Sequence, residues 1–299
     1  MRNDPSRAGD SAFRSSASST LPSHSERLAE AAERLTGVTE MPRLDAEILL
    51  DHALGISRSA LLARLRERAE APGFDEMLER RMESEPIAYI LGEWEFLSLN
   101  LIVRSPLLVP RPETEHLVEA VLEFIGQDPA DLLEIGTGTG CVAIAIARNA
   151  PGSKIIATDT NPIALDTARE NAHRYDLTDR ITLRLGNLFD AVDDADPLFD
   201  VVCSNPPYVE EDAWQTLPRV IRLYEDPAAL LAGHDGLAVV RRLIRGAPAF
   251  LKPGGLLAFE IGAGQRDAVQ DLLLECEYQG IRFRPDLAGI PRIAVAQRP

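Results

Sequence analysis

Cysteine is scarce in this 299-residue sequence, and the few present form no metal-binding or disulfide pattern. Cys141, Cys203 and Cys276 lie far apart, with no CxxC pair and no histidine at zinc-ligand spacing. The five histidines show no metal-ligand spacing among themselves either. We therefore predict no metal site, and we interpret the three cysteines as reduced thiols of a cytoplasmic protein.

Positive charge is also in short supply. The chain has 31 lysines and arginines against 47 aspartates and glutamates, which gives a net charge of -16. Affinity for nucleic acid depends on clustered lysine and arginine side chains that neutralise phosphates. The charge balance therefore argues against direct binding of DNA or RNA and favours a protein or a small molecule as partner.

Long apolar runs are missing as well. No run approaches the roughly 18 residues of a membrane-spanning helix, and the first residues lack the apolar stretch of a signal peptide. We therefore expect a soluble, cytoplasmic protein without a membrane partner. We also expect it to act as a monomer. Its length and its hydrophobic content of 45% suffice for one large α/β domain and a smaller one.

The pattern of apolar residues divides the chain into four parts. The beginning is rich in serine, alanine and proline, a composition typical of disorder. Apolar residues then recur at spacings of three and four, as at Leu28, Ala31 and Leu35, which predicts a small helical bundle. Alternation around Trp94 and Phe96 predicts a β-hairpin. The predicted parts are a disordered tail (1–25), a helical domain (26–90), a β-hairpin linker (91–108) and an α/β domain (109–299).

A glycine-rich loop follows one of the predicted strands. Residues 131–135 form a strand pattern that continues into Gly-Thr-Gly-Thr-Gly (136–140), and an apolar helix pattern begins at Cys141. Glycines allow a sharp turn and close approach to a ligand, while a helix N-terminus offers unpaired N–H groups. The next strand pattern ends in Asp159, whose carboxylate can accept hydrogen bonds from both ribose hydroxyls of an adenosine ligand. The alternative is a glycine-rich turn followed by a capping aspartate.

Further strand patterns predict one α/β sheet. They lie at 181–185, 201–203, 256–261, 281–284 and 292–296, and a turn is predicted at 252–255. In open α/β sheets, ligands bind beyond the carboxyl ends of the parallel strands. The glycine loop, Asp159, Asn187 and Asn205 all follow predicted strands, so we expect them to meet at one edge of the sheet.

The sequence Asn205-Pro206-Pro207-Tyr208 is an unusual way for a strand to end. Proline donates no backbone hydrogen bond, so neither proline can continue the ladder. The side-chain oxygen of Asn205 and the carbonyl of Pro206 can form two acceptors for one planar NH2 group, with the face of Tyr208 packed against it. The alternative is an Asn-Pro-Pro turn with a half-buried tyrosine.

Together, these motifs resemble a class I S-adenosylmethionine-dependent methyltransferase, and more closely the HemK/PrmC family. The resemblance runs from about residue 26 to residue 298. The similar segments are Pro86-Ile87-Ala88-Tyr89-Ile90-Leu91-Gly92, Trp94-Glu95-Phe96, 109–115, 205–208, Glu225-Asp226-Pro227-Ala228-Ala229-Leu230 and Asp286-Leu287-Ala288-Gly289.

The resemblance implies a fold and an activity. The fold is a Rossmann-like, seven-stranded class I methyltransferase sheet, with a small N-terminal helical bundle joined by a β-hairpin. The enzymes of this family are N5-glutamine methyltransferases that use S-adenosylmethionine and act in translation termination. Their substrate is the glutamine of the Gly-Gly-Gln motif in class I peptide chain release factors, and the helical bundle is expected to hold the release factor.

The resemblance also implies roles for individual residues. The loop at 136–140 surrounds the methionine portion of the cofactor, Asp159 binds the ribose, and Asn187 and Leu188 border the adenine. Similar sequences often carry aspartate where Asn187 stands. The implied cofactor residues are Gly136, Thr137, Gly138, Thr139, Gly140, Asp159, Asn187, Leu188 and Asn205. The implied substrate residues are Arg111, Glu113, Asn205, Pro206, Pro207 and Tyr208, of which Asn205, Pro206 and Tyr208 are catalytic.

Other functions fit parts of the pattern. The same tetrapeptide suits an enzyme that methylates the adenine amino group of DNA or RNA, but the acidic chain lacks a basic segment with interspersed aromatic residues. A ribosomal-protein glutamine methyltransferase is a nearer alternative, although such enzymes usually depart from the Pro-Arg-Pro-Glu-Thr pattern (110–114) of this chain. A third possibility is a binding protein whose cofactor fold has lost its activity.

Overall fold

The computed structural model describes residues 21–299, which form two compact units divided after Glu79. The tail that we predicted to be disordered lies mostly outside the described residues. Ordered structure begins slightly earlier than predicted, because helix α1 (His24–Leu35) has Ser23 as its N-cap. The Ser23 hydroxyl accepts from the Glu26 N–H at 3.3 Å, and the Glu26 carboxylate accepts from the Ser23 N–H at 2.7 Å.

The first unit is helical, as its apolar spacing predicts. After α1 it contains α2 (Pro42–Leu54), α3 (Arg58–Ala63) and most of α4 (Phe74–Met82). Leucines on the inner faces of these helices form the core and are fully buried, among them Leu28, Leu35, Leu49 and Leu61. Burial of each such side chain contributes about 1.5 to 3 kcal/mol, so this small unit depends strongly on its leucines.

The second unit begins with a short helix and the predicted hairpin. Helix α5 (Ile87–Leu91) leads into β1 (Glu93–Phe96), which pairs antiparallel with β2 (Leu99–Ile102). The two-residue turn between them has positive φ at both positions, 46° at Leu97 and 61° at Ser98. Two left-handed residues are typical of the tight turn whose twist matches that of a hairpin.

A seven-stranded sheet forms the centre of the second unit, which confirms the predicted fold class. Its strand order is β5-β4-β3-β6-β7-β9-β8, with β3 to β7 parallel and β9 antiparallel to both β7 and β8. The strands are β3 (Asp131–Ile135), β4 (Lys154–Asp159), β5 (Ile181–Leu185), β6 (Phe199–Ser204), β7 (Leu251–Glu260), β8 (Gln279–Pro285) and β9 (Pro291–Gln297).

One predicted turn lies inside a strand. Residues 252–255, which include a proline and two glycines, belong to β7, where the pairing with β6 shifts register between Phe199 and Val201. An irregular pair of this kind accommodates extra residues in one strand without ending it. Proline and glycine therefore mark the irregularity correctly, although the strand continues through it.

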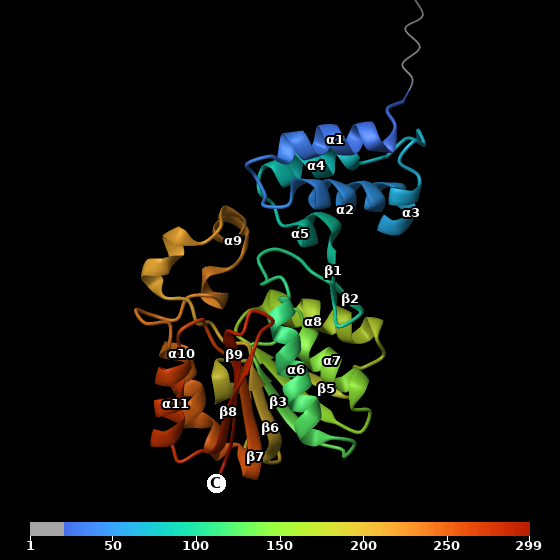
Figure 1. The fold of residues 1–299 in the computed structure, drawn as a ribbon. Helices are drawn as coiled ribbons and strands as arrows, with labels where there is room; N and C mark the ends of the chain where they lie inside the picture. Colours follow the sequence, from blue (N-terminus) through green and yellow to red (C-terminus); the bar gives the residue numbers. More distant parts are fainter. Residues whose placement is uncertain (1–20) are drawn as a thin grey trace, which may run out of the picture. The chain divides into compact units, whose positions relative to one another are not determined.

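Helices cover both faces of the sheet (Figure 1). Helices α6 (Pro112–Ile125), α7 (Cys141–Asn149) and α8 (Pro162–Arg174) lie on one face, and α10 (Ala238–Gly246) and α11 (Arg266–Glu275) lie on the other. Neighbouring strand residues therefore contribute to different cores: Leu132 and Val201 belong to one, and Leu133 and Val202 to the other. Burial on both faces explains why these strands have continuous apolar sequences.

Short elements occupy the edge of the sheet where the parallel strands end. They are η1 (Leu188–Ala191), η2 (Glu211–Thr216), α9 (Arg219–Tyr224) and η3 (Pro227–Ala229), while η4 (Ala247–Ala249) lies between α10 and β7. The chain order reverses direction between β3 and β6, which are neighbours in the sheet. Ligands bind at such a reversal in open α/β sheets, so the fold itself indicates where the site lies. Within residues 21–299, no helix has the length and apolarity needed to cross a membrane.

Candidate active site

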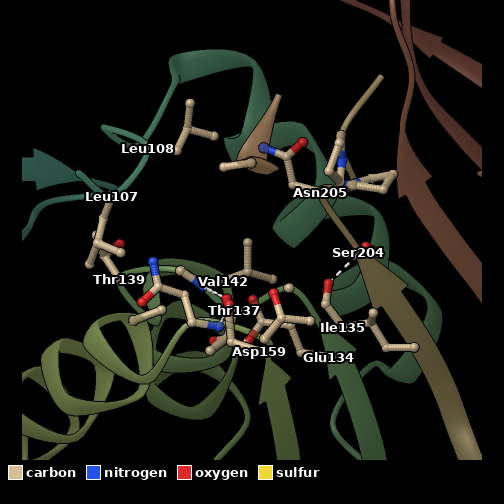
Figure 2. A pocket seen from close by; sticks show the side chains of 18 of the residues that line it. Leu107, Leu108, Glu134, Ile135, Thr137, Thr139, Val142, Asp159, Ser204 and Asn205 are labelled. Carbon is tan, nitrogen blue, oxygen red and sulfur yellow. Dashed lines mark hydrogen bonds between the residues drawn. The ribbon is translucent and has the colours of Figure 1, made fainter. Parts of the chain in front are cut away.

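A cavity of about 220 Å³ lies at the carboxyl ends of β3, β4 and β6. Figure 2 shows Asn205 on the opposite side of this cavity from Thr137, Glu134 and Asp159. The cavity therefore has two ends, which we call the loop end, around the glycine loop, and the acceptor end, around Asn205. Most of the predicted site residues line it: Gly136, Thr137, Gly138, Thr139, Asp159, Asn187, Leu188, Asn205, Pro206 and Pro207.

The glycine loop at the loop end adopts a backbone that requires glycine. Gly136, Gly138 and Gly140 have φ values of 74°, 56° and 82°, in the left-handed region. The N–H groups of Gly136 and Thr137 both donate to the carbonyl of Thr158 at 2.9 Å, which fixes the loop to β4. Gly140 lies behind the loop instead of lining the cavity, and a Cβ there would lie 3.0 Å from the Cβ of Ala168 in α8.

Asp159 forms the structural contacts of the second reading of the sequence, and its role toward a ribose stays a prediction. Its Oδ2 accepts from the Gly138 N–H at 2.8 Å and its Oδ1 accepts from the Asn161 N–H at 2.8 Å, so it holds both the glycine loop and the chain before α8. Each carboxylate oxygen can accept a further hydrogen bond, and Asp159 also lines the cavity. Burial raises its pKa, and these backbone donors oppose the rise.

A buried glutamate under the loop was missed by the sequence analysis. Glu134, in β3, is only 2% exposed and accepts a hydrogen bond from the Thr137 hydroxyl at 2.7 Å. Burial raises the pKa of Glu134 to about 8, and the nearby charge of Asp159 acts in the same direction. The available signal was a charged residue between two apolar residues of the strand, Leu133 and Ile135, next to the glycine loop.

Asn187 and Leu188 line the same end of the cavity, as predicted from the resemblance. Leu188 has a positive φ of 54°, an uncommon conformation for a leucine. The side chain of Asn187 makes no capping hydrogen bond to η1, so its polar atoms are available to the cavity. Whether these two residues bind adenine stays a prediction.

The acceptor end is organised by a second buried glutamate, Glu260, at the end of β7. The Thr114 hydroxyl donates to Glu260 Oε2 at 2.7 Å, and the Tyr208 hydroxyl donates to Glu260 Oε1 at 2.9 Å. Asn205 Nδ2 in turn donates to Thr114 Oγ1 at 3.1 Å. The sequence analysis gave no role to Glu260. A carboxylate that ends an apolar strand was the only available signal.

The tetrapeptide leaves β6 in a firmly held conformation. The hydroxyl of Ser204, just before Asn205, donates to the carbonyl of Ile135 at 2.7 Å, which joins β6 to β3 (Figure 2). The carbonyl of Tyr208 accepts from Gln265 Nε2 at 3.0 Å. Tyr208 is not among the residues that line the cavity, and burial raises its pKa, so its hydroxyl keeps its proton. Its predicted packing against the substrate stays a prediction.

Arg111 and Glu113, two predicted substrate residues, do not line the cavity. Arg111 Nη2 instead donates to both carboxylate oxygens of Glu225, at 2.6 and 2.7 Å, and the Glu225 side chain is only 2% exposed. The Asp226 N–H also donates to the carbonyl of Pro106 at 2.8 Å. These bonds join two segments of the cavity wall, so the geometry gives Arg111 a structural partner.

Comparison with known proteins agrees with this arrangement. Two family models match the chain: the PrmC N-terminal domain over residues 26–92, and the methyltransferase small domain over residues 114–232. The release factor glutamine methyltransferase of Moorella thermoacetica is 40% identical over 281 residues, which are 91% of this chain and 98% of that protein. Its counterpart from Rhodopirellula baltica is 39% identical over 270 residues, 87% and 90% of the two chains.

A solved structure shares the fold at much lower identity. The hMettl16 catalytic domain matches with a TM-score of 0.57 and 16% identity, over 70% of this chain and 80% of that chain. At this identity the match concerns the fold alone, and it confirms the predicted class I methyltransferase sheet.

Proposed function

The chain belongs to the release factor glutamine methyltransferase family, and from this premise we propose the reaction that it carries out. It transfers a methyl group from S-adenosylmethionine to the N5 amide nitrogen of the glutamine in the Gly-Gly-Gln motif of class I release factors. Its substrates are thus proteins of translation termination. The observation that carries this proposal is a single cavity that has a glycine loop at one end and Asn205 with Pro206 at the other.

The loop end fits S-adenosylmethionine. Gly136 and Gly138 expose backbone to the cavity, and Cys141 and Val142 place the first turn of α7 in its wall, where the positive end of the helix dipole favours a carboxylate. Asp159 has acceptor capacity left for ribose hydroxyls. Apolar side chains for an adenine ring are also present in the lining, including Ile135, Ala164 and Leu188. When bound, the cofactor supplies a methyl group on a positively charged sulfonium.

The acceptor end fits a primary amide. A glutamine NH2 group has two protons, and Asn205 Oδ1 and the carbonyl of Pro206 are two acceptors from adjacent residues of the cavity wall. An amide nitrogen is a poor nucleophile because its lone pair is delocalised, so orientation must supply much of the rate. Correct alignment of reacting groups can contribute about 7 to 11 kcal/mol.

The same two acceptors stabilise the charge that develops during transfer. As the N–C bond to the methyl group forms, positive charge grows on the amide nitrogen and its protons become more acidic. Acceptors already in place interact with these protons more strongly in the transition state than in the ground state. The bond between the methyl group and sulfur would break as the N–C bond forms, so that the sulfonium leaves as a neutral thioether. One of the two amide protons would pass to solvent, and the product is a neutral, singly methylated amide.

The direct test is mass spectrometry of a class I release factor after incubation with the protein and S-adenosylmethionine. We expect one added methyl group, on the glutamine of the Gly-Gly-Gln motif, and no methyl group on a release factor in which alanine replaces that glutamine. Parallel incubations with ribosomes, DNA and RNA test the alternative substrates. A label that enters only ribosomal protein or nucleic acid would contradict the proposed substrate.

A further inference from the structure

We propose that Thr114 and Glu260 are positioning residues that set the orientation of the Asn205 side-chain amide. This proposal deepens the proposed function and rests on it, because the orientation decides whether Asn205 offers an acceptor or a donor to the substrate. The two residues form a chain of hydrogen bonds behind Asn205, which we call the relay: Asn205, Thr114 and Glu260 in that order.

The relay joins three segments that are distant in the sequence. Thr114 is in the first turn of α6, Asn205 follows β6, and Glu260 ends β7. Thr114 and Glu260 are 2% and 1% exposed, so water does not compete effectively for these bonds. The two distances, 2.7 Å from Thr114 to Glu260 and 3.1 Å from Asn205 to Thr114, are those of ordinary hydrogen bonds.

The chemistry of the three groups fixes the direction of each bond. An ionised carboxylate can only accept, so the single proton of the Thr114 hydroxyl is directed to Glu260. The Thr114 oxygen can then only accept a hydrogen bond from Asn205. The donor is therefore the amide NH2 group of Asn205. With its nitrogen engaged in this way, Asn205 is left with Oδ1 as its free acceptor.

The opposite orientation of Asn205 leaves two oxygens facing each other. If the amide turned over, Oδ1 would meet the lone pairs of Thr114 Oγ1, which has no second proton to donate. The amide NH2 group would then be presented to a substrate NH2 group, and neither could accept. The relay therefore excludes a conformation that is nearly identical in shape but cannot bind a primary amide.

Tyr208 stabilises the far end of the relay. Its hydroxyl donates to Oε1 of Glu260, so that each oxygen of this carboxylate receives one hydroxyl proton. Burial raises the pKa of Glu260, and the nearby charge of Glu113 acts in the same direction. These two hydroxyls and the charge of Arg292 oppose the rise and favour the ionised form that the relay requires. The last residue of the tetrapeptide thus supports the first through Glu260 and Thr114.

The test replaces the hydroxyl of Thr114 and keeps the shape of the side chain. We expect Thr114→Val to lower kcat for methyl transfer by about 10-fold to 100-fold, because Asn205 loses the partner that orients it. Cofactor affinity, measured by calorimetry, should change by less than about threefold, since the relay lies outside the loop end. Thr114→Ser restores the hydroxyl and should recover most of kcat.

A matched control separates the relay from the general cost of removing a buried hydroxyl. Thr167, in α8, is fully buried, and its hydroxyl donates to the carbonyl of Ile163 at 2.8 Å, away from the relay. Thr167→Val should retain the kcat of the unmodified protein. Equal losses of kcat in Thr114→Val and Thr167→Val, or equal values in Thr114→Val and Thr114→Ser, would overturn the proposal.

A spectroscopic measurement tests the relay without any substrate. The side-chain NH2 signals of Asn205 can be assigned from the nitrogen-15 NMR spectrum by their loss in Asn205→Ala. We expect one of these protons to be protected from exchange with solvent in the wild-type protein and in Thr114→Ser, and to lose protection in Thr114→Val. An unprotected wild-type amide refutes the relay. A protected amide in a protein that does not methylate release factors refutes only the proposed substrate.

Discussion

The two ends of the cavity are built on similar buried groups but in different ways. At the loop end, the buried Glu134 accepts a hydrogen bond from Thr137, three residues further along the chain. At the acceptor end, the buried Glu260 accepts from Thr114, which is 146 residues away. Each end therefore rests on a buried carboxyl group, which lines the cavity at Glu134 and lies outside its lining at Glu260, but only Glu134 finds its hydroxyl partner within the same short segment.

The two ends depend on different kinds of geometry, backbone conformation at the loop end and side-chain orientation at the acceptor end. The loop end presents backbone N–H groups, whose positions follow from φ and ψ and therefore from the placement of glycines. The acceptor end presents a side-chain oxygen, whose position depends on rotation of the Asn205 amide and therefore on its neighbours in space. We expect mutations at the loop end to change cofactor binding, and mutations at the acceptor end to change the rate of transfer.

Asn205→Ala is the strongest test of that separation. Because the mutation removes an acceptor that acts on the transferring amide, we expect kcat to fall by about 100-fold to 1,000-fold. The affinity for S-adenosylmethionine should stay within about threefold of the wild-type value, since the glycine loop and Asp159 are untouched. Single-turnover methyl transfer and calorimetry measure the two quantities separately.

The matched mutation at the loop end is Asn187→Ala. It should weaken cofactor affinity by a few fold and leave kcat at saturating cofactor nearly unchanged, the reverse of the Asn205→Ala pattern. If Asn205→Ala instead weakened cofactor binding as much as it slowed transfer, the two ends would not be separable functions.

A pair of glycine mutations sharpens the comparison within the loop end. Gly140→Ala places a Cβ 3.0 Å from Ala168 at a φ of 82°, and strain plus crowding should cost about 3 kcal/mol of folding stability. Gly138→Ala has the same kind of strain at a φ of 56°, but its Cβ meets no atom within 4 Å and adds bulk to the wall of the cavity. We expect it to cost about 1 kcal/mol of stability.

The two glycine variants should also differ in cofactor binding. Gly138→Ala is expected to lower affinity for S-adenosylmethionine by about 10-fold or more, because the added methyl group occupies cavity space. Urea denaturation measures the folding stability of both variants, and calorimetry measures their affinity for S-adenosylmethionine. A Gly138→Ala protein that binds the cofactor normally would show that the loop does not approach the ligand closely.

The loop end was largely predictable from the sequence, because its determinants are local. The strand at 131–135, the glycine loop and Asp159 are separated by short, fixed spacings, and the structure places them together as predicted. The tetrapeptide was equally visible, since Asn205 and two prolines end a strand in an unusual way. The sheet was also predictable, because strands buried on both faces give continuous apolar sequences.

The remaining features depend on contacts between distant segments. Nothing in the residues around Glu260 indicates that its oxygens receive the hydroxyls of Thr114 and Tyr208. For the same reason the ion pair between Arg111 and Glu225, 114 residues away, was not foreseen, and the role of Arg111 toward the substrate stays a prediction. A short motif shows that a polar residue is present, but the fold decides which partner satisfies it.

The smallest expected effect concerns the buried carboxyl group of the loop end. Burial raises the pKa of Glu134 from its ordinary value near 4.5 to about 8, so the folded protein holds a proton that the unfolded chain has released. Stability from this group is therefore complete at low pH and is lost as the pH rises towards 8. Glu134→Gln mimics the protonated form, so this variant should not lose stability from this position as the pH rises.

Between pH 6 and pH 8, the free energy of unfolding of the wild-type protein should therefore fall by about 2 kcal/mol more than that of Glu134→Gln. Urea denaturation of both proteins without cofactor measures this difference at each pH, and the exposed Glu275 supplies a control, because Glu275→Gln should show no such trend. A difference that is independent of pH would mean that Glu134 is ionised in the folded protein. The loop end would then hold a buried negative charge under its glycines, as the relay requires at the acceptor end, and the two carboxyl groups would act alike.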